Sequence, residues 1–245
     1  MVSPLVLLAA CVSITPLPKG TATPVADGDP ASGPTVTHRP SSVPSLPVGH
    51  PSPGVASPRP SRSPDVLLRE DFSIDGTWYD YLGDFGSIRT VDGAYRMRVG
   101  PDGGALYGTP NSAPLFDDTT VEVTVTFVEP AGDTYAAIAC RGVDDFVWYE
   151  LGVTSDGVAF ISHVRRDGYE DLAVEDTGPL RRGGTVRLAA TCRGSRDVAL
   201  SLTVDGETVT KATDTDGLAL GFVGLVASGE GGAILDFDDL LIRRP

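Results

Sequence analysis

The sequence predicts an all-β protein built as a two-sheet sandwich, and three observations support this. After residue 65, apolar and polar residues alternate through several stretches, which is the pattern of strands with one buried face. Asp-Gly dipeptides separate these stretches, and this pair favours tight hairpins because glycine accepts positive φ. No stretch shows sustained helical periodicity. About a dozen short strands at this spacing are typical of a jelly-roll sandwich.

The clearest strands are predicted at residues 119–127, 186–192 and 198–204. In each, every second residue is apolar: Val121, Val123, Val125 and Phe127; then Val186, Leu188, Ala190 and Cys192; then Val198, Leu200, Leu202 and Val204. Hairpin turns are expected at the dipeptides Asp92-Gly93, Asp156-Gly157, Asp167-Gly168, Asp205-Gly206 and Asp216-Gly217.

Composition divides the chain into three segments. Residues 1–11 are predicted to be a signal peptide. Residues 12–64, rich in Pro, Ser and Thr, are predicted to be a disordered stalk, because frequent proline prevents helices and central strands. Residues 65–245 contain the tryptophans and the alternating strands, and form the predicted sandwich domain. About 180 residues are enough for one such domain with its own core.

The amino terminus predicts export. An apolar run ends in Leu8-Ala9-Ala10-Cys11 and is too short to span a bilayer. This stretch resembles the lipobox of bacterial lipoproteins, which implies acylation of Cys11 and an extracytoplasmic, membrane-anchored protein. The first four residues lack the positive charge of a signal peptide, so the true start could lie upstream. Plain secretion and a transmembrane start are the alternatives.

The acidic charge lies in the predicted domain. Residues 1–64 carry four basic and two acidic side chains, so the rest has a net charge of −16, against −14 for the whole chain. Such a surface repels nucleic acid, whose binding needs Lys and Arg to neutralise phosphates. The sequence therefore predicts no nucleic-acid partner.

Several short motifs carry a family resemblance. They are Arg69-Glu70-Asp71-Phe72-Ser73, Cys140-Arg141 followed by Asp145 and Tyr149, Gly221-Phe222-Val223-Gly224, and Phe237-Asp238-Asp239. In this order they resemble the concanavalin A-like, laminin G-type sandwich modules of bacterial exported proteins. These are related to keto-disaccharide hydrolase-like and lectin- or glucanase-like domains. The resemblance implies a two-sheet jelly roll with its first and last strands side by side. It leaves function open, since this fold hosts lectins, sensor ectodomains and glycanases.

Cys140 and Cys192 fall on the apolar faces of their predicted strands. In an exported protein, two cysteines that lie close together oxidise, so a disulfide is expected. Two buried free thiols are the alternative.

The chain lacks the common catalytic signatures. Retaining glycanases of this fold need paired carboxylates, and an E-x-D-x-x-E strand is absent; the nearest approach is Leu235-Asp236-Phe237-Asp238. A Gly-x-Ser-x-Gly elbow and a P-loop are absent as well. These absences favour a non-catalytic binding module, with a glycoside hydrolase kept as the alternative.

Strand parity predicts a binding face. Odd-numbered residues from Val147 to Val153 form the more apolar side, so Trp148 and Glu150 point outward. The same reasoning turns Tyr135 and Arg141 outward, and His163 is expected to extend the patch. An indole beside charged groups suits sugars. These side chains could instead merely cover the sheet, and an early loop holding Trp78, Tyr79 and Tyr81 is an alternative ligand contact.

A structural calcium site is a further hypothesis. If the terminal strands pair, Glu70 and Asp71 lie near Asp236 and Asp238, and calcium takes six to eight oxygen ligands. The alternative is a set of solvated acids.

Together these patterns predict a tethered, non-catalytic module whose partner is a glycan or another cell-envelope component. A glycoside hydrolase and a structural or protein-binding ectodomain remain the alternatives.

Overall fold

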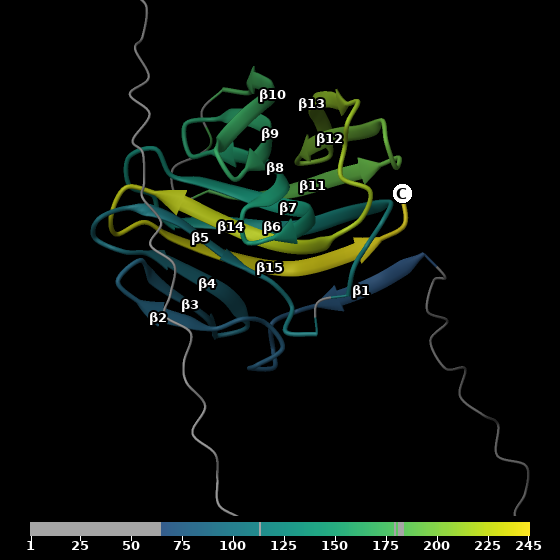
Figure 1. Ribbon diagram of the computed structural model, residues 1–245. Helices are drawn as coiled ribbons and strands as arrows, with labels where there is room; N and C mark the ends of the chain where they lie inside the picture. Colours follow the sequence, from purple (N-terminus) through teal and green to yellow (C-terminus); the bar gives the residue numbers. More distant parts are fainter. Residues whose placement is uncertain (1–64, 113, 179, 181–183) are drawn as a thin grey trace, which may run out of the picture. The chain divides into compact units, whose positions relative to one another are not determined.

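The computed structural model describes residues 65–112, 114–178, 180 and 184–245, which form fifteen strands and no helix (Figure 1). A nine-stranded sheet contains β1 (Val66–Glu70), β2 (Tyr81–Gly83), β3 (Gly86–Val91), β4 (Ala94–Val99), β6 (Thr119–Glu129), β11 (Thr185–Arg193), β12 (Val198–Val204), β13 (Glu207–Asp214) and β15 (Ile234–Arg243). A six-stranded sheet contains β5 (Gly104–Gly108), β7 (Tyr135–Asp144), β8 (Val147–Thr154), β9 (Val158–Arg165), β10 (Gly168–Asp176) and β14 (Phe222–Gly229).

The predicted signal peptide, the predicted lipidation site Cys11 and the predicted stalk lie within residues 1–64, outside the described residues. Within the described part of the chain, no helix is long and apolar enough to cross a membrane.

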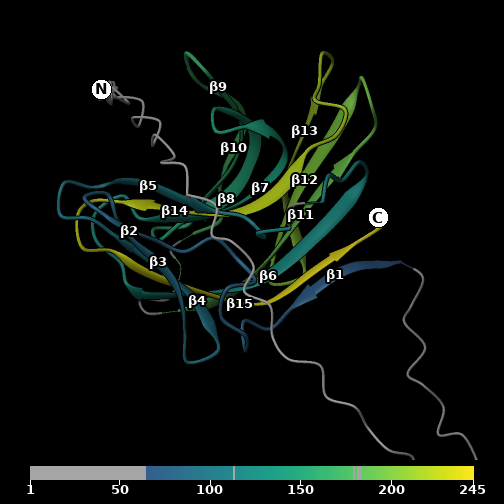
Figure 2. The same cartoon turned by 60° about the horizontal axis from the view of Figure 1, so that its bottom comes forward.

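The strand order is that of a jelly roll. It runs β13-β12-β11-β6-β15-β4-β3-β2 in the larger sheet, with β1 on β15, and β10-β9-β8-β7-β14-β5 in the smaller sheet. The hairpins β9–β10 and β12–β13 lie side by side, one from each sheet (Figures 1 and 2). The terminal strands pair antiparallel, with Glu70 opposite Leu240, so the expected neighbourhood of β1 and β15 is confirmed.

Four of the five predicted Asp-Gly turns join paired strands. They lie between β3 and β4, β8 and β9, β9 and β10, and β12 and β13. The hairpin predicted at Asp216-Gly217 is wrong, because β13 and β14 belong to different sheets. Here the backbone N–H of Gly217 donates to Arg196 and that of Leu218 to the Tyr149 hydroxyl, so the segment crosses between the sheets.

The inward faces of both sheets form one hydrophobic core. The alternating residues predicted on β6, β11 and β12 all point into it. At one end Phe72, Trp78 and Tyr95 pack with ring centroids 5.2–5.5 Å apart. Trp78 is buried in this aromatic cluster and therefore closes the core, whereas Tyr79 is exposed.

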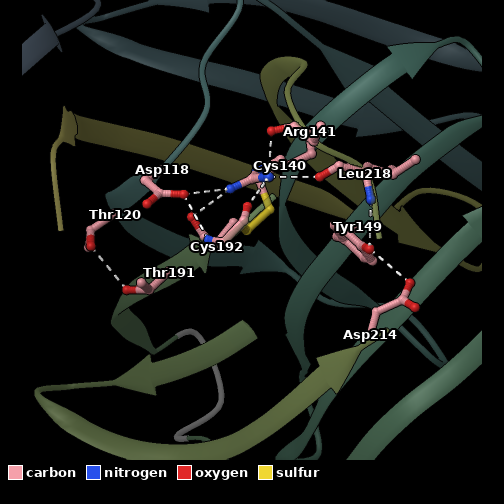
Figure 3. The surroundings of a disulfide bond; sticks show 11 residues. Asp118, Thr120, Cys140, Arg141, Tyr149, Thr191, Cys192, Asp214 and Leu218 are labelled. Atoms are coloured by element: carbon pink, nitrogen blue, oxygen red, sulfur yellow. Dashed lines mark hydrogen bonds and ion pairs between the residues drawn. A yellow bond between two sulfur atoms is a disulfide. The ribbon is translucent and has the colours of Figure 1, made fainter. Parts of the chain in front are cut away.

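The disulfide predicted between Cys140 and Cys192 is present (Figure 3). Cys140 lies on β7 and Cys192 on β11, so the bond joins the two sheets across a Cα–Cα distance of 6.8 Å. Both residues are buried in the core.

Replacing both cysteines by serine should lower the free energy of unfolding by about 4 kcal/mol, because the bond closes a loop with a sequence separation of 52. Urea unfolding under non-reducing conditions measures this loss. Wild-type protein unfolded in excess reductant is the control and should match the double variant. Equal stability of oxidised wild type and double variant would contradict the prediction.

Candidate functional site

Three of the five predicted site residues meet on the outward face of the six-stranded sheet. Trp148 and Glu150 alternate with the core residues Tyr149 and Leu151, as parity predicted. Glu150 lies between β7 and β9, opposite Ala139 on one side and Ser162 on the other. Tyr135 packs against the same outward cluster.

We call this surface the aromatic face. Its apolar members are Tyr107, Tyr135, Ala137, Ala139, Trp148, Phe160, Val164, Phe222 and Val226. They come from β5, β7, β8, β9 and β14, so the face spans five neighbouring strands. Small residues lie beneath the rings, and Ala137 and Ala139 are fully buried although they point away from the core.

Two glycines leave room for the rings. A Cβ on Gly152 would lie 2.5 Å from the Ala137 Cβ and 2.8 Å from the Phe160 ring, and one on Gly142 would lie 2.1 Å from the Phe222 ring. Gly152 pairs with Phe160, and Gly142 pairs with Phe222. The Phe160 and Phe222 rings therefore each lie against the glycine backbone of the neighbouring strand.

Trp148 is less accessible than a solvent-facing position suggests. Its exposed fraction is 7 %, and the Tyr107 ring lies 5.5 Å away between centroids. The Tyr107 hydroxyl donates to Asp145 Oδ1 at 2.6 Å, which holds the ring beside the indole. Beside this face, on β10, Tyr169 pairs with Val164 and extends the face by a ring that is 63 % exposed.

Glu150 is the polar centre of the aromatic face. It is 1 % exposed, and its Oε2 accepts a hydrogen bond from Trp148 Nε1 at 3.1 Å. Among the described residues, Oε1 has no hydrogen-bond partner. Burial raises the pKa of Glu150, while the Tyr135 hydroxyl and the Trp148 indole act in the opposite direction. A buried carboxyl oxygen without a hydrogen-bond partner lowers the free energy of unfolding. The position of Glu150 on this face is therefore not explained by stability.

The outward placement predicted for Arg141 is wrong. A bulge interrupts the β7–β8 register after Cys140, and Arg141 has a φ of 58°, so simple alternation fails there. Its guanidinium is buried, and Nη1 lies within 2.7 Å of the carbonyl oxygens of Gly194, Leu218 and Ala219 (Figure 3). Nη2 also donates to Asp118 Oδ1 at 2.9 Å.

His163 also fails to join the predicted patch. It pairs with Tyr149, so both side chains point inward. His163 Nδ1 lies 3.0 Å from Asp214 Oδ2, and the Tyr149 hydroxyl donates to the same oxygen at 2.8 Å. His163 lies on β9 of the six-stranded sheet and Asp214 is the last residue of β13 in the nine-stranded sheet, so this pair connects the two sheets.

The charges of the His163–Asp214 pair follow from their surroundings. Burial, and then the nearby Arg165, lower the pKa of His163, whereas Asp214 raises it less. Burial opposes ionisation of Asp214, but hydrogen bonds from Asp216, Tyr149 and His163 outweigh it and lower the pKa of Asp214.

The four predicted calcium ligands do not converge. The Asp236 carboxylate is held by Arg96 at 2.6 and 2.7 Å, while Asp71 accepts from the backbone and hydroxyl of Ser73. Glu70 accepts from the backbone of Phe72, and Asp238 from that of Asp239. Within the described ranges, no three acidic, histidine or cysteine side chains form a group that could hold a metal ion.

The outward face of the nine-stranded sheet is chemically different. Glu122 accepts hydrogen bonds from Arg187 and Arg243, at 2.8 and 2.9 Å, and Arg96 pairs with Asp236. Such partly exposed ion pairs contribute little to stability. Aromatic rings and a buried carboxyl therefore distinguish the six-stranded sheet.

A cavity of about 600 Å³ lies elsewhere, where the end of β10 meets β11 and the β12–β13 hairpin. Among its described lining residues, Asp205 and Glu207 are charged. None of the residues described in its wall belongs to the aromatic face.

Sequence reasoning missed Tyr107, Phe160 and Phe222. The signal for Phe160 was present, because Phe160 and Val164 alternate with Ala159 and Ile161, so both faces of this strand are apolar. Tyr107 and Phe222 could not be found this way, since only the β5–β14–β7 pairing brings them to the face.

Comparisons with solved structures agree on the fold. The carbohydrate-binding module CBM66 from Bacillus subtilis matches with a TM-score of 0.56 and 16% identity, over 68% of this chain and 95% of that one. A protein of unknown function with a galectin-like fold from Bacillus subtilis matches with a TM-score of 0.57 and 12% identity, over 75% and 97% of the two chains. A β-glucanase from Bacillus licheniformis matches with a TM-score of 0.53 and 10% identity, over 73% and 97%.

The domain is a concanavalin A-like jelly-roll sandwich, as the sequence motifs implied. No protein-family model matches the chain, and no curated protein matches it in sequence.

Arg141→Met should lower the free energy of unfolding by about 3 kcal/mol, because several carbonyl oxygens lose their donor inside the protein. Asp118→Asn, the matched control, keeps an acceptor at a half-exposed position and should cost about 1 kcal/mol or less. Urea unfolding of both variants gives the comparison. Similar losses in the two variants would show that the carbonyl contacts do not carry the effect.

Stability should fall as the pH drops below about 6.5, the ordinary pKa of histidine. The folded pKa of His163 lies lower, so over this window the unfolded chain binds more protons than the folded one. His163→Gln should flatten this slope. The free energy of unfolding measured at several pH values in both proteins tests this; parallel curves would contradict it.

Proposed function

We propose that the protein is a non-catalytic carbohydrate-binding module and that the aromatic face binds the glycan. The observation that supports this best is the contrast between the two outward faces. One is lined by rings around a buried carboxyl, and the other carries partly exposed ion pairs.

The chemistry of the aromatic face suits sugars. Aromatic rings cover the apolar C–H faces of a pyranose, while polar groups at the ring edges bond its hydroxyls. Tyr135 and Tyr169 each offer a ring and a hydroxyl, and Ser162 and Asp171 form a polar pair beside them at 2.8 Å. Similar solved structures include a carbohydrate-binding module and a glucanase, which supports a glycan partner without identifying it.

We further propose that the module is exported and tethered to a membrane through acylated Cys11, with residues 12–64 as the spacer. The support is the sequence Leu8-Ala9-Ala10-Cys11 and the proline-rich composition that follows it. Mass spectrometry of the mature amino terminus separates an acylated cysteine from a secreted, unmodified chain.

A glycoside hydrolase is the second candidate. Glu150, Ser162 and Asp171 lie in one row across β8, β9 and β10, so two carboxyls share the face with one residue between them. Inverting hydrolases hold their two carboxyls about 6.5–9.5 Å apart, and a buried acid with a raised pKa suits a proton donor. Release of shortened products from oligosaccharides would establish catalysis.

The binding proposal is tested by titrating the full chain with a panel of cell-wall and plant glycans. Tyr169→Ala should weaken binding to any glycan that binds by about fivefold, because stacking of a sugar on one ring contributes on the order of 1 kcal/mol. Leu82→Ala removes an exposed apolar side chain from β2 of the other sheet and should leave affinity unchanged.

Failure of every glycan in the panel to bind would remove the proposed function. Saturable binding that Tyr169→Ala leaves intact would keep a carbohydrate-binding module but move its site away from the aromatic face.

A further inference from the structure

The basic side chains of the six-stranded sheet are already engaged. Among the described residues of this sheet and its β9–β10 turn, the arginines are Arg141, Arg165 and Arg166. Arg141 is buried against carbonyl oxygens, and Arg165 pairs with Glu170 at 2.7 Å. Arg166 pairs with Asp144 and lies over the Phe146 ring. An anionic ligand would find no free cation here.

The acidic groups are differently placed. Glu150 is buried at the centre of the aromatic face, with Oε1 lacking a partner among the described residues. Asp171 lies two strands away in the same row and accepts only from Ser162 in the described structure. The face therefore offers acceptors, and the ligand must supply donors or positive charge.

The rings around Glu150 favour positive charge in particular. The Trp148 indole donates to its carboxyl, and burial, followed by the nearby Glu150, raises the pKa of both Tyr135 and Tyr169. A cation over an aromatic ring is attracted by its negative face, most strongly where water is excluded. A carboxylate in the same place adds a charge-assisted hydrogen bond.

We propose that the aromatic face recognises an ammonium group through Glu150, so that its ligand is a glycan with unsubstituted amino groups. This inference rests on the proposed carbohydrate-binding function and narrows its ligand class. An ammonium would give Oε1 a charged donor, in addition to the Trp148 indole on Oε2 and the nearby Tyr135 hydroxyl. Since the carboxyl is 1 % exposed, contact requires rotation of a neighbouring ring, a change common at binding surfaces.

The test compares two ligands with the same backbone, the trimers of glucosamine and of N-acetylglucosamine, with the full chain in calorimetry. The amino trimer should bind at least tenfold more tightly. Glu150→Gln should remove most of that preference, while Glu175→Gln should preserve it. Glu175 is an exposed residue of β10 in the same sheet, so the control makes the same Glu-to-Gln change away from the aromatic face. This control separates recognition by Glu150 from general attraction to an acidic protein.

A second readout does not depend on the variants. Burial raises the pKa of Glu150 above its ordinary value of 4.5, so at pH 4.5 the free protein largely keeps this proton while the amino groups of the ligand are charged. Binding of an ammonium at that pH should release protons, which titrations in two buffers of different ionisation enthalpy detect. Thermal unfolding verifies that Glu150→Gln is folded. If this variant is unfolded, proton release by the wild-type protein on binding the amino trimer tests the ammonium proposal instead.

Equal affinity for the two trimers, or equal losses in the two variants, would overturn the ammonium proposal and leave carbohydrate binding in place. Binding of neither trimer nor any other glycan would overturn the proposed function as well.

Discussion

The junction at Cys140 and Arg141 supports both the sandwich and the aromatic face. The disulfide joins β7 to β11 through the core, and the next residue turns its guanidinium toward carbonyls of the β11–β12 and β13–β14 connections (Figure 3). A positive φ at Arg141 makes this turn, at a bulge that also shifts the register of β7 against β8. The bond constrains the unfolded chain, whereas the hydrogen bonds satisfy backbone groups that would otherwise be buried alone.

The same junction leads directly to the aromatic face. The β13–β14 crossover that Arg141 holds delivers Phe222 onto Gly142, and the β7–β8 turn presents Asp145 to the Tyr107 hydroxyl. Tyr107 in turn lies beside Trp148. Arg141 thus positions the backbone segments that carry residues of the aromatic face, although its own side chain does not lie on that face.

Glu150 is the costly feature of this arrangement. An apolar residue would fit the rings without leaving an oxygen unpaired, and a buried carboxyl is destabilising unless it is neutral or paired. The opposite sheet places its acids on the surface, where arginines pair with them. A buried acid with one unpaired oxygen among aromatic rings therefore fits the proposed ligand recognition better than a role in stability.

The sequence by itself determined the fold class, four hairpin turns, the disulfide partners and the outward direction of Trp148 and Glu150. These features depend on period-2 alternation and on turn residues, which are local properties of the chain. Tertiary structure decided the rest. A bulge turned Arg141 inward, the cross-strand pairing of His163 with Tyr149 took it to the core side, and Arg96 engaged an expected calcium ligand. Alternation fails at a bulge, and no local pattern states which strands become neighbours, so the site could be completed only once the sheets were assembled.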